Sequence, residues 1–170
     1  MALAETDYKA VMAETIERVA SGGVLLTSQR EGGKPNAMAI GWGTIGSIWS
    51  RPVFIVLVRP SRFTFSLIEA SGEFTVNVPP ENMRDTVMYC GSISGRDHDK
   101  FAEKNLTPVP GKAVSCPIVK ECLVNYECTV IHSNDLVNAN LAPDIVSSAY
   151  PKGDFHRVYF GQILRVTRQG

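Results

Sequence analysis

The first regular pattern in the chain is an apolar stripe of helical period. Its members recur at the three- and four-residue spacing of one helix face: Tyr8, Val11, Met12, Thr15, Ile16 and Val19. The small residues Ser21-Gly22-Gly23 end the stripe. The pattern predicts an amphipathic helix whose apolar side covers another part of the molecule.

Beyond residue 23 the pattern changes to that of β-strands. We expect strands at 24–29, 36–50, 53–58, 73–78, 122–131 and 155–168. The polar segment 31–35 is typical of a hairpin turn. Several glycines within 36–50 indicate a bulge, or the close approach of another backbone or a ligand. In the strand 122–131, Cys122 and Cys128 fall in register with the apolar side, which favours core packing for both thiols.

Short helices are expected between these strands. One is predicted over 61–70, with Ser61 as its N-cap and Ser71-Gly72 as its end. Two more are expected after Pro79-Pro80 and after Ser94-Gly95, the latter with Asp97 near its beginning. Because strands and helices do not alternate strictly, the pattern predicts a mainly β protein. We expect a closed antiparallel barrel with short peripheral helices rather than an open parallel sheet.

Chain length and net charge exclude two classes of function. With 170 residues, the chain is expected to form one domain over 1–170, which excludes a dehydrogenase with separate nucleotide and catalytic domains. Seventeen basic and seventeen acidic side chains give a net charge of zero. The basic surface of a whole nucleic-acid-binding domain is therefore excluded.

The remaining composition favours a cytoplasmic protein. No apolar run approaches the ~20 residues of a membrane helix, and the first residues lack the basic and apolar regions of a secretory signal. The four cysteines contain no C-x-x-C pair and are expected to be reduced thiols. Their spacing does not favour a zinc site, and we expect no metal.

A first candidate segment runs from residue 36 to residue 44. Its small residues expose backbone donors and acceptors beside one aromatic face, a combination that suits a flat hydrogen-bonding ring such as a flavin. The cofactor-binding candidates here are Asn36, Ala37, Met38, Ala39, Trp42 and Thr44. A barrel strand that is merely curved by its glycines is the alternative.

Two further segments carry cationic and hydroxyl side chains. The first, at a strand-to-helix junction, offers guanidinium groups and helix N–H groups to a phosphate, although a solvated loop is the alternative. Its candidates are Arg59, Ser61, Arg62, Phe63 and Thr64. The second, over 90–101, supplies Ser94, Arg96 and Lys100. Arg96 and Lys100 have the i, i+4 spacing of one helix side and are expected to pair with Asp97 and Asp99. An ordinary capped helix with local salt bridges is the alternative.

In this order, the segments resemble the flavin reductase-like family of FMN-binding split barrels, which includes the flavoredoxins. Four stretches over roughly 16–166 carry the resemblance: 36–44, Pro60-Ser61-Arg62-Phe63-Thr64, Glu73-Phe74-Thr75-Val76-Asn77-Val78, and Cys90 to Phe101. The last is the most specific. It also argues against the pyridoxamine phosphate oxidase-like enzymes, which share the barrel.

The resemblance implies an FMN-binding oxidoreductase. The 36–42 stretch would meet the isoalloxazine ring and ribityl chain. Ser61, Arg62 and Thr64 would hold the phosphate, with Lys100 and Arg96 closing on it. Family members are homodimers with the flavin near the subunit interface. No nucleic acid and no membrane are expected as partners.

The electron donor and acceptor stay open. In reductases of the family a histidine lies near the nicotinamide and the flavin, which suggests His156 as a catalytic candidate. Here Phe155 separates His156 from Asp154, and Gln162 replaces an acidic residue of the family pattern. Flavin reduction by NAD(P)H is therefore one hypothesis. The alternatives are electron transfer between redox proteins and a flavin-binding carrier or sensor without turnover.

Overall fold

The computed structural model describes residues 3–170. The helices are α1 (Tyr8–Ser21), α2 (Phe63–Ser71), α3 (Arg84–Ser92), α4 (Lys100–Glu103) and α5 (Pro143–Ala149), with 3₁₀ turns η1 (Glu81–Met83) and η2 (Asn138–Asn140). The strands are β1 (Leu3–Glu5), β2 (Val24–Ser28), β3 (Asn36–Ile40), β4 (Gly43–Ile48), β5 (Arg51–Val58), β6 (Glu73–Val78), β7 (Pro108–Val109), β8 (Ile118–Val119), β9 (Val124–Asp135) and β10 (Arg157–Gln169).

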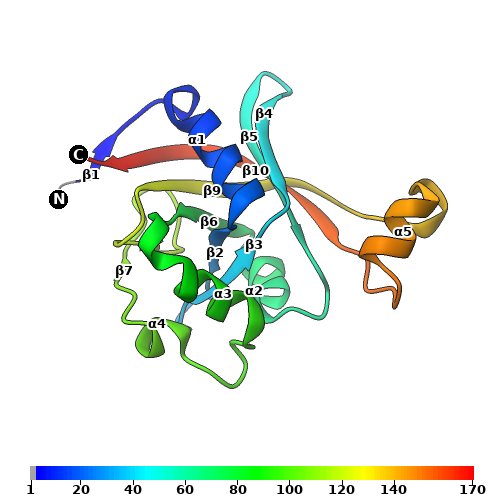
Figure 1. Cartoon of the computed structure of the whole chain (residues 1–170). Coiled ribbons are helices and arrows are strands. Elements are labelled where there is room, and N and C mark those ends of the chain that lie inside the picture. The colour runs from blue at the N-terminus through cyan, green and yellow to red at the C-terminus, as the bar shows by residue number, and fades with distance from the viewer. Residues whose placement is uncertain (1–2) are drawn as a thin grey trace.

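The main sheet is antiparallel and wraps into a barrel that is not closed by hydrogen bonds (Figure 1). Its strand order is β3-β2-β6-β9-β10-β5-β4, with β1 added to β10. β3 and β4 follow each other along the chain, yet they lie at opposite ends of this order. The expected closed barrel is therefore wrong. At Gly41-Trp42 the backbone leaves the edge of the sheet formed by β3 and joins the other edge as β4.

The barrel interior is apolar. The inward side chains of β2, β5, β6, β9 and β10 form one buried cluster, and α1 adds Val11 and Val19 to it. Thr15 of α1 bonds the Tyr126 hydroxyl at 2.6 Å, which satisfies two polar groups inside this cluster. The predicted amphipathic helix is thus confirmed, and it covers the barrel interior.

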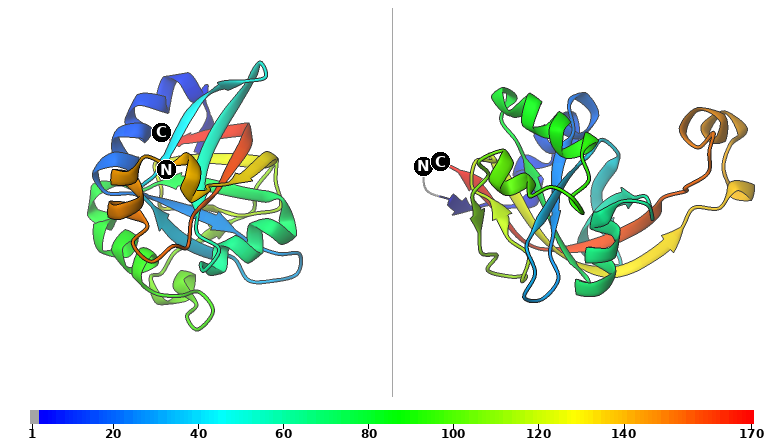
Figure 2. Two further views of the ribbon diagram at one scale, coloured as in Figure 1. Left: turned by 90° about the vertical axis from the view of Figure 1, so that its right-hand side faces the viewer. Right: turned by 90° about the horizontal axis from the view of Figure 1, so that it is seen from below.

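A second apolar cluster lies outside the barrel. Leu25 of β2 and Ala37 of β3 pack against α3 and α4 through Val87, Cys90 and Phe101. Figure 2 shows these helices on one side of the barrel. They bring the 90–100 segment to the outer face of β3.

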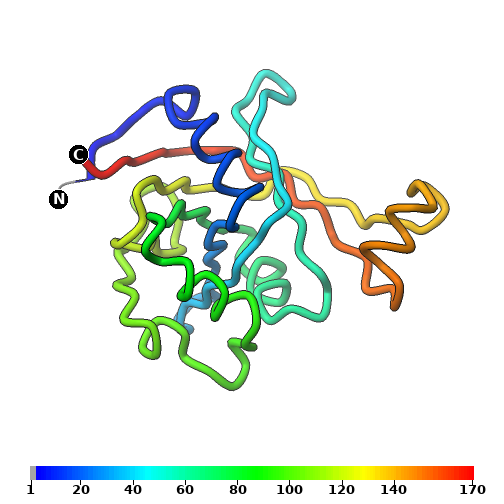
Figure 3. The backbone as a smooth tube through the Cα atoms, in the orientation of Figure 1, coloured from blue at the N-terminus to red at the C-terminus, as the bar shows by residue number. Residues whose placement is uncertain are grey.

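The segment 136–155, which we call the arm, extends from the ends of β9 and β10 and carries η2 and α5. It protrudes from the rest of the molecule (Figures 1 and 2). α5 buries none of its own residues, and the last residues of β9 are exposed. The two ends of the described chain lie together on the opposite side (Figure 3), where β1 pairs with β10.

Three element predictions need correction. The run 36–50 is two strands, because Trp49 and Ser50 adopt positive φ at a hairpin turn and Gly41-Trp42 interrupts the pairing. The expected helix after Ser94-Gly95 begins only at Lys100, where the Asp99 carboxylate accepts a bond from the Ala102 N–H. The helix expected over 61–70 begins at Phe63, and Ser61 is not its cap.

Candidate functional site

A cavity of about 270 Å³ opens on the barrel side that carries the break between β3 and β4. Its size is close to the lower end of small-molecule sites, about 300–1,000 Å³. The cavity is lined by three segments far apart in sequence: 36–42, 59–64 and 90–100. These are the three segments that the sequence singled out.

Asn36 connects the three segments. Its Nδ2 donates to Thr64 Oγ1 at 2.8 Å, and both side chains are buried. A Cβ atom at Gly95 would lie 1.9 Å from Asn36 Oδ1, so the 94–96 turn reaches Asn36 only because residue 95 is glycine. Because Thr64 Oγ1 accepts from Asn36, its own hydroxyl proton remains to be donated to a ligand.

Two guanidinium groups lie at one end of the cavity. Arg96 donates to the Ser61 carbonyl at 3.0 Å and lies over the Phe63 ring. Within residues 3–170 the Arg62 guanidinium has no hydrogen-bond or ion-pair partner, although it lines the cavity. Arg62 also directly precedes α2, whose first N–H groups lack intrahelical acceptors. This end of the cavity therefore offers positive charge and N–H donors to an anion.

Lys100 is almost fully buried beneath the cavity. Its Nζ donates to the carbonyls of Ala37 at 2.9 Å and Cys90 at 2.8 Å. Burial lowers the pKa of Lys100, while the Arg62 charge acts in the same direction. The expected pairing of Arg96 and Lys100 with Asp97 and Asp99 is wrong, since Asp99 pairs with Lys34 instead.

Arg59 and Ser61 bind the arm. The Arg59 guanidinium donates to the backbone carbonyls of Ala149, Gly153 and Asp154, at 2.8 to 3.4 Å. The Ser61 hydroxyl and N–H both donate to the Asp154 carboxylate, at 2.5 and 3.3 Å. Two residues expected at a phosphate thus hold the arm against the cavity in this structure.

His156 forms the cavity wall next to the arm. Its Nδ1 lies 2.7 Å from the Tyr150 hydroxyl, and its ring centre lies 5.1 Å from that of Trp42. Burial lowers the pKa of His156 to about 4, and the nearby Arg59 charge contributes to this shift. The imidazole is therefore neutral at pH 7.

Most predicted site residues are gathered here. The cavity is lined by Asn36, Met38, Ala39, Trp42, Arg59, Ser61, Arg62, Phe63, Thr64, Ser94, Arg96, Lys100 and His156. Ala37 lies behind the wall, where its carbonyl accepts from Lys100, and Thr44 lies on β4 away from the cavity lining. Sequence reasoning missed Tyr150 and Asp154, because the polar stretch around them carries no periodic pattern.

The donor set fits FMN. Phosphate suits the end with Arg62, Arg96 and the start of α2. A flat ring suits the wall at Ala39 and Gly41 beside Trp42, because these small residues leave the backbone groups open to approach. Within residues 3–170 no group of His, Cys, Asp and Glu forms a metal cluster, and all four cysteines are free thiols. No helix of the described residues is long and apolar enough to cross a membrane.

Comparison with known proteins agrees with this geometry. An uncharacterized protein of Archaeoglobus fulgidus is 34% identical over 134 residues, covering 79% of this chain and 66% of that protein. The flavoredoxin of Desulfovibrio vulgaris (Miyazaki F) has 27% identity and a TM-score of 0.70, over 86% of this chain and 69% of that one. A flavoredoxin from Methanosarcina acetivorans has 27% identity and a TM-score of 0.69, over 87% and 68%. The chain thus spans about two thirds of the length of each.

These likenesses confirm the expected split-barrel fold. The family profile named "Flavin reductase like domain" matches residues 16–169, a range that contains every residue of the cavity wall. The protein belongs to the flavin reductase-like family.

Proposed function

We propose that this protein binds FMN in the cavity and acts as an oxidoreductase of the flavin reductase or flavoredoxin type. The observation that carries the proposal is the convergence of 36–42, 59–64 and 90–100 on one cavity. Its cationic end includes Arg62, whose guanidinium has no partner within residues 3–170. The similar flavoredoxins support the same assignment.

In this proposal, Arg62, Arg96, Thr64 and the first N–H groups of α2 bind the phosphate. The backbone of 38–42 and the Trp42 side chain orient the ring, and the neutral His156 faces its outer side. Bound FMN supplies hydride and one-electron chemistry, while the chain supplies position and electrostatics. The proposal assigns no side chain of the cavity the role of a proton donor or acceptor in reduction of the ring.

NAD(P)H is the first candidate for the electron donor. The test is anaerobic mixing of FMN-loaded protein with NADH or NADPH while the visible absorption of the flavin is followed. Bleaching with either nucleotide supports the reductase. If neither bleaches a flavin that dithionite does reduce, the protein is an electron carrier or sensor whose donor is another redox protein.

The site assignment is tested by the double variant Arg62→Ala and Thr64→Ala. Losing a charged and a neutral hydrogen bond to phosphate should weaken FMN binding by about 2 to 4 kcal/mol. Flavin fluorescence titration measures this change. The control is Arg51→Ala, which removes an arginine that binds Gln162 outside the cavity. Equal affinity of the double variant and the control would show that the phosphate binds elsewhere.

We also propose that the protein is a homodimer. The arm supports this proposal, because the seven-residue helix α5 buries none of its side chains within its own chain. Val137 and Ile145 leave 48% and 44% of their surfaces exposed on the arm. Sedimentation should show a dimer, and Val137→Asp with Ile145→Asp should shift it toward monomer. A wild-type monomer at all concentrations would contradict the proposal.

A further inference from the structure

The contact between Tyr150 and His156 joins the arm to the cavity. Tyr150 directly follows α5, and His156 directly precedes β10. Both side chains are buried, and the Tyr150 hydroxyl lies 2.7 Å from His156 Nδ1. Nothing in the binding of FMN by Arg62 and Thr64 requires this hydrogen bond.

The direction of the hydrogen bond between Tyr150 and His156 depends on which of the two groups supplies the proton. Within residues 3–170, His156 Nδ1 is the one group that can accept the Tyr150 hydroxyl proton, because the other contact of that hydroxyl is the His156 backbone N–H, a donor; His156 Nε2 has no hydrogen-bond partner there. If Nδ1 carried the imidazole proton, it would donate to the phenol oxygen and leave the phenol proton without an acceptor. If the phenol donates to Nδ1, the phenol proton has its acceptor and Nδ1 has its donor, and the one ring nitrogen left without a partner in residues 3–170 is Nε2. The imidazole proton then resides on Nε2.

The charges around His156 keep the ring neutral. Arg59 and Arg62 lie close enough to disfavour a positive charge on the imidazole of His156, and burial also favours the neutral ring. Asp154 opposes them, but its carboxylate is bonded to Ser61. Arg59 also lies over the Tyr150 ring, 4.9 Å from its centre, so it holds the phenol in place as well.

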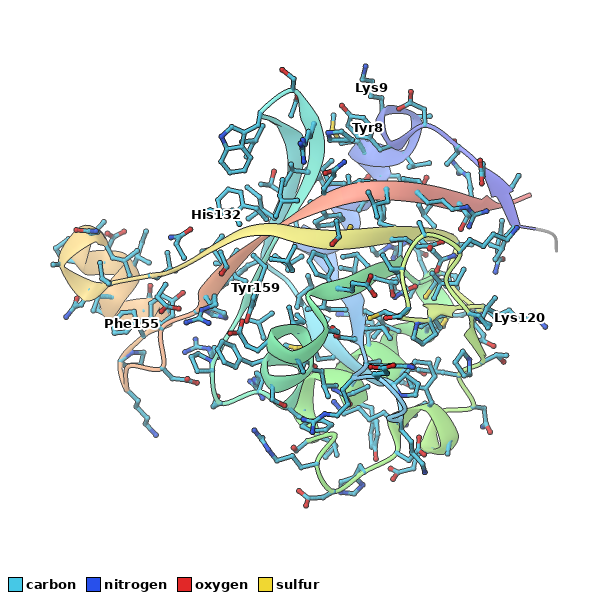
Figure 4. All side chains as sticks on the ribbon, turned by 180° about the vertical axis from the view of Figure 1, so that it is seen from behind. Tyr8, Lys9, Lys120, His132, Phe155 and Tyr159 are labelled. Carbon is cyan, nitrogen blue, oxygen red and sulfur yellow. The ribbon has the colours of Figure 1, made fainter. Side chains whose placement is uncertain are left out.

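Neighbouring rings restrict the orientation of the pair. Phe155 stacks on Tyr150 with ring centres 4.8 Å apart, and Trp42 packs beside His156. Figure 4 shows Phe155 at the arm, remote from Tyr159 in the barrel. His156 itself lines the cavity. Nε2, the ring nitrogen that has no partner within residues 3–170, is therefore available to a ligand.

We propose that Tyr150 is a positioning residue that fixes His156 as a neutral Nε2–H hydrogen-bond donor toward the cavity. The ligand group that it recognises is a hydrogen-bond acceptor, such as a ring carbonyl oxygen or an unprotonated ring nitrogen. The arm thereby selects the tautomer of a residue in the site. The identity of the ligand in the cavity rests on the proposed function, whereas the tautomer of His156 does not.

Nitrogen-15 NMR of the imidazoles tests the proposal in the full chain without flavin. The protein has three histidines, and the signals of His156 are identified by their loss in His156→Gln. The wild type should show a protonated Nε2 and an accepting Nδ1 at pH 7. In Tyr150→Phe, both nitrogen shifts should move toward the averaged values of an unrestrained imidazole. An Nδ1-protonated tautomer in the wild type, or unchanged shifts in Tyr150→Phe, would overturn the proposal.

Tyr159→Phe is the matched control. It removes another buried phenol hydroxyl, which donates to Glu69 at 2.7 Å, and it should leave the His156 signals unchanged. If Tyr150→Phe lost its fold, its whole spectrum would collapse. Phe155→Leu loosens the Tyr150 ring but keeps the hydroxyl, so the His156 shifts should then show partial averaging. Unchanged shifts in Phe155→Leu would overturn the proposal.

Adding FMN separates this proposal from the proposed function. Binding that shifts the wild-type Nε2 signal supports the donor role, and binding that leaves it unchanged overturns that role. If FMN does not bind at all, the proposed function fails, while the tautomer measured without flavin still decides the role of Tyr150.

Discussion

Residue 95 has room for no side chain. Gly95 lies against Asn36, the residue through which the three cavity segments meet. In Gly95→Ala the methyl group would displace the Asn36 amide or push the 94–96 turn outward. We expect FMN binding to weaken at least tenfold, about 1.4 kcal/mol, in a fluorescence titration. Gly46→Ala, where nothing lies within 4 Å of the added carbon, should bind FMN like the wild type.

Glu127 is a second residue on which several buried hydrogen bonds depend. One carboxylate oxygen of this buried side chain accepts from the N–H groups of Lys112, Ala113 and Val114, and the other accepts from Arg165. Glu127→Gln replaces one acceptor with a donor and leaves partners unpaired. The free energy of unfolding should fall by about 2–4 kcal/mol in urea titrations. Glu121→Gln, which affects one bond to the Thr107 N–H, should cost clearly less.

At the scale of elements, the Arg59 side chain donates hydrogen bonds to three carbonyls of the arm. Arg59→Ala removes the donors to three arm carbonyls while β5 itself remains paired on both sides. Hydrogen exchange at the amides of 149–156 should accelerate about tenfold or more, a loss of about 1.4 kcal/mol in local protection. Exchange in β6 should not change. Arg96→Ala, which removes a cavity charge but no arm contact, should leave arm exchange at the wild-type rate.

Elements with a clear period were predictable, and those held by distant contacts were not. α1, β2, β5, β6 and β9 carry their apolar pattern in the sequence, because α1 buries one face and the strands contribute buried side chains to the core. α5 was missed, since it buries nothing and has no stripe to detect. The break at Gly41-Trp42 was missed for another reason. It depends on which strand lies beside β3 and β4, and local spacing does not contain that information.

At the scale of the whole molecule, His156 links stability to pH. A histidine titrates near pH 6.5 in an unfolded chain, whereas burial lowers the pKa of His156 to about 4 in the folded protein. Between these values the unfolded state binds more protons, so the free energy of unfolding decreases as pH falls from 6.5 to 4. This contribution to the free energy of unfolding is present above pH 6.5, and its complete loss is on the order of 3 kcal/mol.

Urea titrations at pH 7 and pH 4.5 measure this loss. His156→Gln should lose less stability between the two pH values than the wild type. His132→Gln changes an exposed histidine that has no ion pair within residues 3–170, and it should keep the wild-type dependence. An identical pH dependence in wild type and His156→Gln would contradict the assignment of a neutral buried imidazole.

The family resemblance implied which residues would meet in the cavity, while their individual bonds were not predictable. Arg62, Thr64 and Arg96 line it as expected. Arg59 and Ser61 carry the same chemical groups, yet both are engaged by the arm. That difference arises from the path of residues 136–155, which passes the end of β5 only in the folded chain.

The two tryptophans lie in different parts of the fold, so their fluorescence reports on two separate regions. Trp42 lies in the cavity wall beside His156, whereas Trp49 lies at the β4–β5 hairpin turn against His132 and Phe160. A flavin in the cavity would quench the emission of Trp42 by energy transfer more strongly than that of Trp49. In Trp49→Phe the remaining emission would therefore report cavity occupancy, and in Trp42→Phe it would report changes around the outer hairpin.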